Sequence, residues 1–168
     1  MERTINPQKA SVILAEQLPK GIFLCVGGTE NVMTIGWGGL AFYWGKNIFV
    51  APIRPQRFTY PLLEKEMAFT LSVPAPDTMT EELAKAGTLS GRDGNKFDAI
   101  GLHTMPARMV NAPVIVGPNI ALTLECRVLA THDFTAAGTD RSIVRSAYAA
   151  HDFHTLFYGE ILMCYGTI

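Results

Sequence analysis

Short apolar runs, separated by Gly, Pro and polar turns, make up most of the chain. Around Phe69, Leu71 and Val73 the apolar residues alternate with others, which is typical of a β-strand. Residues 27–31 form a Gly-rich turn of the kind that joins two strands of a hairpin. The pattern predicts strands over Gly21–Val26, Val32–Tyr43, Asn47–Ile53, Ala68–Val73, Ile120–Thr131 and His154–Tyr165.

Few segments show the pattern of a helix. Thr59–Lys65 is expected to be a short helix because Pro61 suits a first helical turn. A second helix is expected over Thr80–Ala86, with Thr78 or Thr80 as its N-cap. The remaining segments carry weaker signals: a helical turn over Lys96–Gly101, irregular structure over Val110–Pro118, and a long excursion over Thr135–Ala150 in which a helix from Asp140 is one interpretation.

Strands therefore follow one another without regular intervening helices. This order indicates an antiparallel barrel rather than a doubly wound parallel sheet. The expected fold class is mainly β, with about six strands and small peripheral helices.

The composition fits one folded domain over residues 1–168. Hydrophobic residues make up 48% of the chain, which is enough for a core. Only 17% of the residues are charged, against roughly 25% in an average domain, and this favours a surface partly hidden in an oligomer. The net charge of −1 argues against a nucleic-acid-binding protein, because such proteins usually carry a basic surplus.

The sequence favours a cytoplasmic protein that is not associated with a membrane. Its start is polar, and no apolar run approaches the roughly 20 residues of a membrane helix. Cys25, Cys126 and Cys164 lie far apart in apolar runs, which favours buried, reduced thiols. No metal site is expected, because His151 and His154 would lie on opposite faces of a strand and no cysteine or carboxylate cluster completes a ligand set.

Two stretches suit an anionic ligand. Thr88–Lys96 combines hydroxyl groups, two glycines, an arginine and a lysine, which together suit a phosphate. Arg54–Tyr60 is a second basic cluster, directly before an expected helix. A solvated surface loop is the alternative interpretation of both. Rossmann, Walker and nucleophile-elbow motifs do not occur, so a nucleotide-like cofactor would be held in another way.

Two ring side chains are candidates for contact with a flat ligand. Glycines on both sides of Trp37 leave room for such a ring, and His154 stands at the start of an apolar strand. A core position for the tryptophan and a structural role for the histidine are the alternatives.

Four of the motifs occur in a fixed order along the chain: Asn31–Gly38, Val50–Tyr60, Gly87–Phe97 and His154–Ile161. Their residues, order and spacing resemble the flavin reductase-like family, and most closely its flavoredoxin branch. The resemblance extends from about Leu18 to the C-terminus. It implies an FMN-binding split β-barrel, normally a homodimer, with FMN in a groove near the dimer interface.

The resemblance also implies the residues that contact FMN: Asn31, Met33, Thr34, Ile35, Gly36, Trp37, Ala51, Arg54, Arg57, Thr59, Ser90, Gly91, Lys96, His154 and Tyr165. The first segment would line the isoalloxazine ring, partly through backbone groups. Arg54 and Thr59 would lie near the phosphate or the ribityl chain, and the loop from Ser90 to Lys96 would complete the phosphate pocket. Tyr165 would cover one side of the site.

The sequence departs from the family pattern in three places. Ala86 stands where many relatives carry a cysteine, and Gly94 replaces a more usual apolar residue of the phosphate loop. Residues 130–152 match no pattern of the family, so the surface on the substrate side is not defined by the resemblance.

The expected function is an FMN-dependent oxidoreductase that takes a hydride from NADH or NADPH. FMN itself supplies the redox chemistry, and backbone N–H groups from Thr34 to Gly36 would stabilise the reduced flavin. The alternatives are a flavoredoxin-like electron carrier reduced by a partner protein and a non-catalytic binding module. His154 is the expected catalytic-site residue, in a positioning role, and its ordinary pKa near 6.5 predicts a positive charge at mildly acidic pH.

Overall fold

The structure, a computed structural model, describes residues 3–167 and confirms a mainly β fold with small helices. Eight strands form one sheet and two form a separate hairpin. The strands are β1 (Arg3–Thr4), β2 (Ile22–Val26), β3 (Asn31–Ile35), β4 (Gly39–Tyr43), β5 (Lys46–Ile53), β6 (Ala68–Pro74), β7 (Thr104–Pro106), β8 (Pro113–Ile115), β9 (Ile120–Asp133) and β10 (Thr155–Gly166). The helices are α1 (Ser11–Gln17), a 3-10 turn over Leu18–Lys20, α2 (Thr59–Glu66), α3 (Thr80–Thr88), α4 (Lys96–Ile100) and α5 (Arg141–Ala147).

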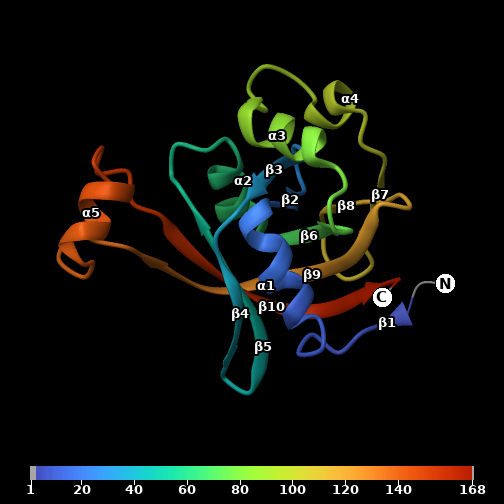
Figure 1. The fold of residues 1–168 in the computed structure, drawn as a ribbon, viewed down its shortest axis with the longest axis horizontal. Helices are drawn as coiled ribbons and strands as arrows, with labels where there is room; N and C mark the ends of the chain where they lie inside the picture. The colour runs from blue at the N-terminus through green and yellow to red at the C-terminus, as the bar shows by residue number, and fades with distance from the viewer. Residues whose placement is uncertain (1–2, 168) are drawn as a thin grey trace.

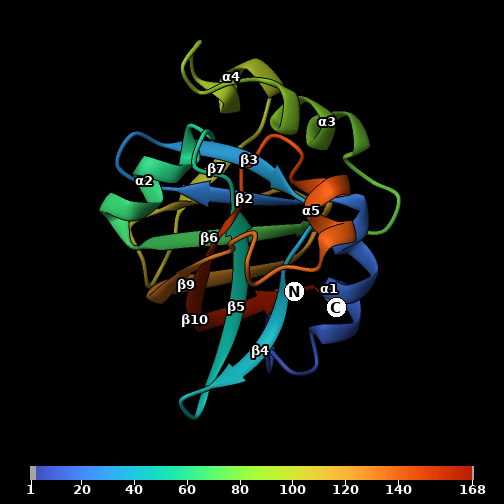
Figure 2. The same cartoon turned by 90° about the vertical axis from the view of Figure 1, so that its left-hand side faces the viewer.

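The large sheet has the strand order β3-β2-β6-β9-β10-β5-β4, with β1 added beside β10. Every pairing in it is antiparallel. β3 and β4 are neighbours in sequence but lie at opposite ends of this strand order. Figures 1 and 2 show the β4–β5 hairpin projecting beyond the rest of the sheet.

Two clusters of apolar side chains lie on the two faces of β2. Ile22 and Leu24 belong to the larger core, and Phe23 and Cys25 belong to a smaller one that contains Leu83 of α3. Because successive side chains of a strand point to opposite faces, this strand is buried along its whole length. Helices α3 and α4 lie together above β2 and β3 in both views (Figures 1 and 2).

The single strand predicted over Val32–Tyr43 is wrong. The chain leaves β3 at Ile35, crosses over at Gly36–Gly38 and enters β4, which pairs with β5 instead of β2. At Gly38 the backbone has φ +129, and a Cβ atom there would lie 2.5 Å from the carbonyl oxygen of Val50. This crossing therefore requires glycine for both its backbone angle and its close approach.

Other sequence expectations also need correction. The sequence did not predict helix α1, and the short strand β8 lies within the segment expected to be irregular. Helix α3 has Met79 as its N-cap, without a side-chain cap, and continues past Gly87. The helix from Asp140 is confirmed as α5, with Asp140 as its N-cap. The Asp140 carboxylate accepts a hydrogen bond from the backbone N–H of Ser142 at 2.8 Å.

All three cysteines are buried and free, as expected. No helix in the described part of the chain is long and apolar enough to cross a membrane.

Candidate functional site

Two neighbouring hollows share Met33 and Arg57 in their walls. The first, named here the polar hollow, measures about 540 Å³ and is lined by Asn31, Met33, Gln56, Arg57, Phe58, Thr59, Ala86, Gly87, Thr88, Leu89, Ser90, Gly91, Arg92 and Lys96. The second, the aromatic hollow, measures about 600 Å³ and is lined by Met33, Thr34, Ile35, Gly36, Trp37, Pro52, Arg54, Arg57 and His154.

Three segments meet in the polar hollow: the start of β3, the start of α2 and the loop between α3 and α4. The Asn31 amide donates to the Thr59 hydroxyl at 2.8 Å and so joins β3 to α2. The loop packs closely against both, because a Cβ atom on Gly91 would lie 2.4 Å from the Phe58 ring and 2.5 Å from the Asn31 amide oxygen. Only glycine permits this approach.

Two of the three cations that line the polar hollow, Lys96 and Arg57, differ in character. The Lys96 side chain is buried and donates to the carbonyl oxygen of Ala86 at 2.6 Å. Burial, together with the neighbouring charge of Arg57, lowers the pKa of Lys96 to about 8. Arg57 is exposed, and its guanidinium makes no hydrogen bond or ion pair within residues 3–167. With the Ser90 hydroxyl, this donor set suits a phosphate group.

The aromatic hollow lies between β3 on one side and the ends of β5 and β10 on the other. Residues Met33 to Gly36 form the first wall, and Pro52 belongs to the second. The rings of Trp37 and His154 lie with their centroids 5.0 Å apart. Half of the Trp37 side chain is exposed, which leaves its ring available to a ligand.

The positive charge predicted for His154 at mildly acidic pH is wrong. Its ring is buried, and its Nδ1 atom lies 2.9 Å from the Tyr148 hydroxyl oxygen. Burial, with a smaller contribution from the positive charge of Arg54, lowers the pKa of His154 to about 4. The imidazole is therefore neutral from mildly acidic pH upward.

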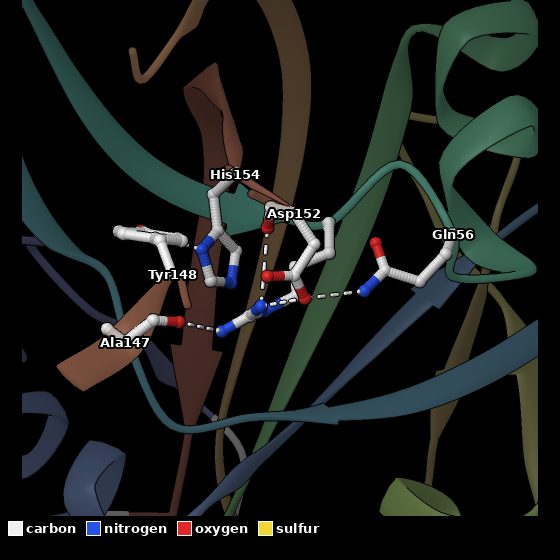
Figure 3. A network of polar contacts seen from close by, with 6 residues as sticks. Gln56, Ala147, Tyr148, Asp152 and His154 are labelled. Carbon is white, nitrogen blue, oxygen red and sulfur yellow. Dashed lines mark hydrogen bonds and ion pairs between the residues drawn. The ribbon is translucent and has the colours of Figure 1, made fainter. Parts of the chain in front are cut away.

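Arg54, expected near the phosphate or the ribityl chain, lines the aromatic hollow but not the polar hollow. Its guanidinium forms an ion pair with Asp152 and donates to the carbonyl oxygen of Ala147 at 3.0 Å. Figure 3 labels these two partner residues. Gln56 donates to the same Asp152 carboxylate at 2.9 Å. The charge of Arg54 is thus matched by a carboxylate of the chain itself.

Two of the expected site residues lie outside both hollows. Ala51 is fully buried in the larger core, and its neighbour Pro52 faces the aromatic hollow because side chains alternate along β5. Tyr165 lies at the opposite end of β10 from His154 and donates to the buried Glu125 carboxylate at 3.0 Å. It therefore does not cover either hollow of its own chain.

Gln56, Arg92, Tyr148 and Asp152 are among the residues of the site and its surroundings that were not identified from the sequence. Gln56 and Arg92 belong to the two basic stretches, and the Arg92 guanidinium donates to the carbonyl oxygen of Gln56 at 3.2 Å. Their place in those stretches was the available signal. Tyr148 and Asp152 fall in the excursion that matches no family pattern, and no local signal marks them.

No group of three His, Cys, Asp or Glu side chains within residues 3–167 is arranged to hold a metal ion.

Comparison with known proteins identifies the family of the chain. The model of the flavin reductase like domain matches residues 15–166. An uncharacterized protein of Archaeoglobus fulgidus is 30% identical over 146 residues, which span 86% of this chain and 71% of that protein.

Two solved structures illustrate the shared fold. The flavoredoxin of Desulfovibrio vulgaris (Miyazaki F) gives a TM-score of 0.65 at 22% identity, covering 86% of this chain and 67% of that one. An FMN-binding domain of a flavin reductases-like enzyme from Shewanella baltica OS155 gives a TM-score of 0.70 at 16% identity, covering 99% of this chain and 77% of that one.

Proposed function

The chain belongs to the flavin reductase-like domain family, and from this premise we propose that it binds FMN and transfers a hydride from NADH or NADPH to the flavin. The observation that carries the proposal is the adjacency of the two hollows, which share Met33 and Arg57. One is rich in cations and hydroxyl groups, and the other is lined by residues of β3 and by the rings of Trp37 and His154. FMN has the same division, with a phosphate at one end and a flat ring at the other.

The residues of the polar hollow would hold the phosphate. Arg57 offers a guanidinium without an ion pair to residues 3–167, and Lys96 offers an ammonium group that is already desolvated, so its contact with an anion would be strong. Ser90 adds a hydroxyl group. The backbone from Thr34 to Gly36 would lie along the ring, and its N–H groups would favour the reduced, negatively charged form.

Bound FMN would supply the hydride-accepting chemistry itself. The chain would contribute orientation and exclusion of water. Neutral His154 and the half-exposed Trp37 would form the side of the aromatic hollow where a second flat ring approaches. Hydride transfer needs no proton from His154 in this scheme, in agreement with its low pKa.

The first test is titration of the purified protein with FMN, followed by flavin absorbance. Arg57→Ala and Lys96→Ala should each raise the Kd by roughly 10- to 100-fold, because a hydrogen bond to a charged group is worth about 1.5–3 kcal/mol. Lys85→Ala is the matched control, since this exposed lysine pairs with Glu81 outside the hollow. Failure of the wild-type protein to bind FMN would refute the proposal.

The second test mixes the FMN-loaded protein with NADH and with NADPH in a stopped-flow instrument. Bleaching of the flavin by either nucleotide supports the reductase. A protein that binds FMN but is bleached by neither is not a nicotinamide-dependent reductase, and the electron carrier then becomes the better interpretation.

A further inference from the structure

A 20-residue segment between β9 and β10, residues 134–153, is named here the arm. It carries α5, which stands away from the sheet in Figure 1. No residue of α5 is buried, so the packing of this helix does little to hold the arm in place. The position of the arm must depend on a small number of contacts elsewhere along it.

The first of these contacts is made by Arg54, directly after β5. One of its terminal nitrogens pairs with the Asp152 carboxylate and donates to the Asp152 carbonyl oxygen at 3.2 Å. The other donates to the Ala147 carbonyl oxygen at 3.0 Å, at the end of α5. The guanidinium carbon also lies 5.3 Å from the centroid of the Tyr148 ring. The Arg54 side chain therefore contacts both ends of the segment from Ala147 to Asp152, and Figure 3 labels these two residues.

The second contact joins the arm to His154. Tyr148 is the only buried residue of residues 141–150, and its hydroxyl group lies 2.9 Å from the His154 Nδ1 atom. Its ring stacks on that of Phe153, with the centroids 4.6 Å apart. Both anchors of the arm are thus residues that line the aromatic hollow, Arg54 and His154.

We propose that Asp152 is a positioning residue that, through Arg54 and Tyr148, holds the arm against Arg54 and His154, two residues that line the aromatic hollow, and so limits which reactants reach the cofactor ring. The reactant whose access is limited is the one that exchanges electrons with bound FMN, either a nicotinamide nucleotide or an electron acceptor. This part of the inference rests on the proposed function. The polar hollow lies outside the network except for Gln56, so the phosphate contacts of Arg57 and Lys96 do not depend on Asp152.

The carboxylate matters more than an ordinary surface ion pair would. The Arg54 and Asp152 side chains are 19% and 26% exposed, and Asp152 accepts from both Arg54 and Gln56. Removing the charge of Asp152 leaves a largely buried guanidinium without its counter-charge, which is more costly than losing an exposed pair. Arg54 would then turn toward solvent and release Ala147 and Tyr148.

The first experiment uses hydrogen exchange on the protein without added FMN. Asp152→Asn should raise the exchange rate of the amides over residues 141–148 at least tenfold, and Asp152→Glu should restore most of the protection. Arg141→Gln is the control, because this exposed residue of the same arm makes no contact with the network. Unchanged protection in Asp152→Asn would overturn the anchoring role.

The second experiment measures access to the ring. FMN-loaded protein is photoreduced and mixed with menadione, a neutral quinone, and the rate of flavin reoxidation is followed. Asp152→Asn should react at least fivefold faster while its Kd for FMN stays within threefold of wild type, and Asp152→Glu should behave like wild type. A reoxidation rate that stays unchanged or falls overturns the proposal, and so does a Kd that rises with the rate.

The two experiments separate the two proposals. If the wild-type protein does not bind FMN, the proposed function fails, and the exchange measurement still decides whether Asp152 anchors the arm.

Discussion

Lys96 is buried in the polar hollow, where its pKa is lowered from 10.5 to about 8. Because only the protonated amine attracts a phosphate, the affinity for FMN should fall as the pH rises through and beyond 8. We expect the Kd to increase by up to about tenfold per pH unit between pH 8.5 and 10, measured by fluorescence titration. Lys96→Ala should flatten this dependence, whereas Lys85→Ala should keep it. A wild-type Kd that is constant across this range would contradict the assignment.

For His154 the expected effect is a loss of stability when the pH falls. Its pKa is about 4 in the folded protein and near 6.5 in the unfolded chain, so the unfolded chain binds more protons between these values. The free energy of unfolding should therefore fall as the pH is lowered from about 6.5 to 4, by at most about 1.4 kcal/mol per pH unit. Urea titrations at a series of pH values should show a smaller slope in His154→Gln. An unchanged slope would show that this histidine is not the group responsible.

At the level of elements, the sequence located most strands because alternation and Gly or Pro boundaries are local signals. It did not reveal the break between β3 and β4. The apolar residues on both sides of Gly36–Gly38 continue one pattern, and the change of partner strand depends on tertiary pairing. The arm shows the same limit, since Tyr148 and Asp152 acquire a role only when β5 and β10 bring Arg54 and His154 beside them.

The crossing at Gly38 gives a prediction for this element. Alanine there would require φ near +129 and would place a Cβ atom 2.5 Å from the Val50 carbonyl oxygen. We expect Gly38→Ala to lower the free energy of unfolding by more than about 1 kcal/mol and to weaken FMN binding, since Trp37 would be displaced. Gly39→Ala is the control, because a Cβ atom at that position meets nothing within 4 Å. Equal stability of the two variants in thermal melts would contradict this account.

At the level of the whole molecule, the fold class and family could be predicted from the sequence, because four ordered motifs carry more information than any one of them. The two hollows bring 13 of the 15 expected residues together, and the exceptions are Ala51 and Tyr165. Ala51 points into the core because side chains alternate between the two faces of β5, and Tyr165 lies at the far end of the long strand β10. Neither can be derived from a motif alone, since both depend on which face and which end of a strand the sheet presents to the site.

The surface favours association of two copies. Phe42, Tyr43 and Trp44 are 64%, 47% and 61% exposed at the end of the projecting β4–β5 hairpin, in a chain that is only 17% charged. We expect a homodimer in sedimentation equilibrium, with Trp44→Asp raising the dissociation constant at least 100-fold. Met105→Asp, at an equally exposed position of β7, should leave the dimer intact. A monomeric wild-type protein would contradict the prediction.

The edge strands β3 and β4 lie at opposite ends of the strand order, and the aromatic hollow lies between β3 and the ends of β5 and β10. A ligand seated there touches two parts of the sheet that do not pair directly with each other. Bound FMN would then connect these two parts of the sheet, so loss of the cofactor would lower the stability of the fold as well as abolish the redox activity. By mass action, FMN at 100 times its Kd adds about 2.7 kcal/mol to the free energy of unfolding, so the melting temperature should rise with FMN concentration. Riboflavin, which lacks the phosphate, should give a smaller rise, and a cell short of flavin should hold less of this protein.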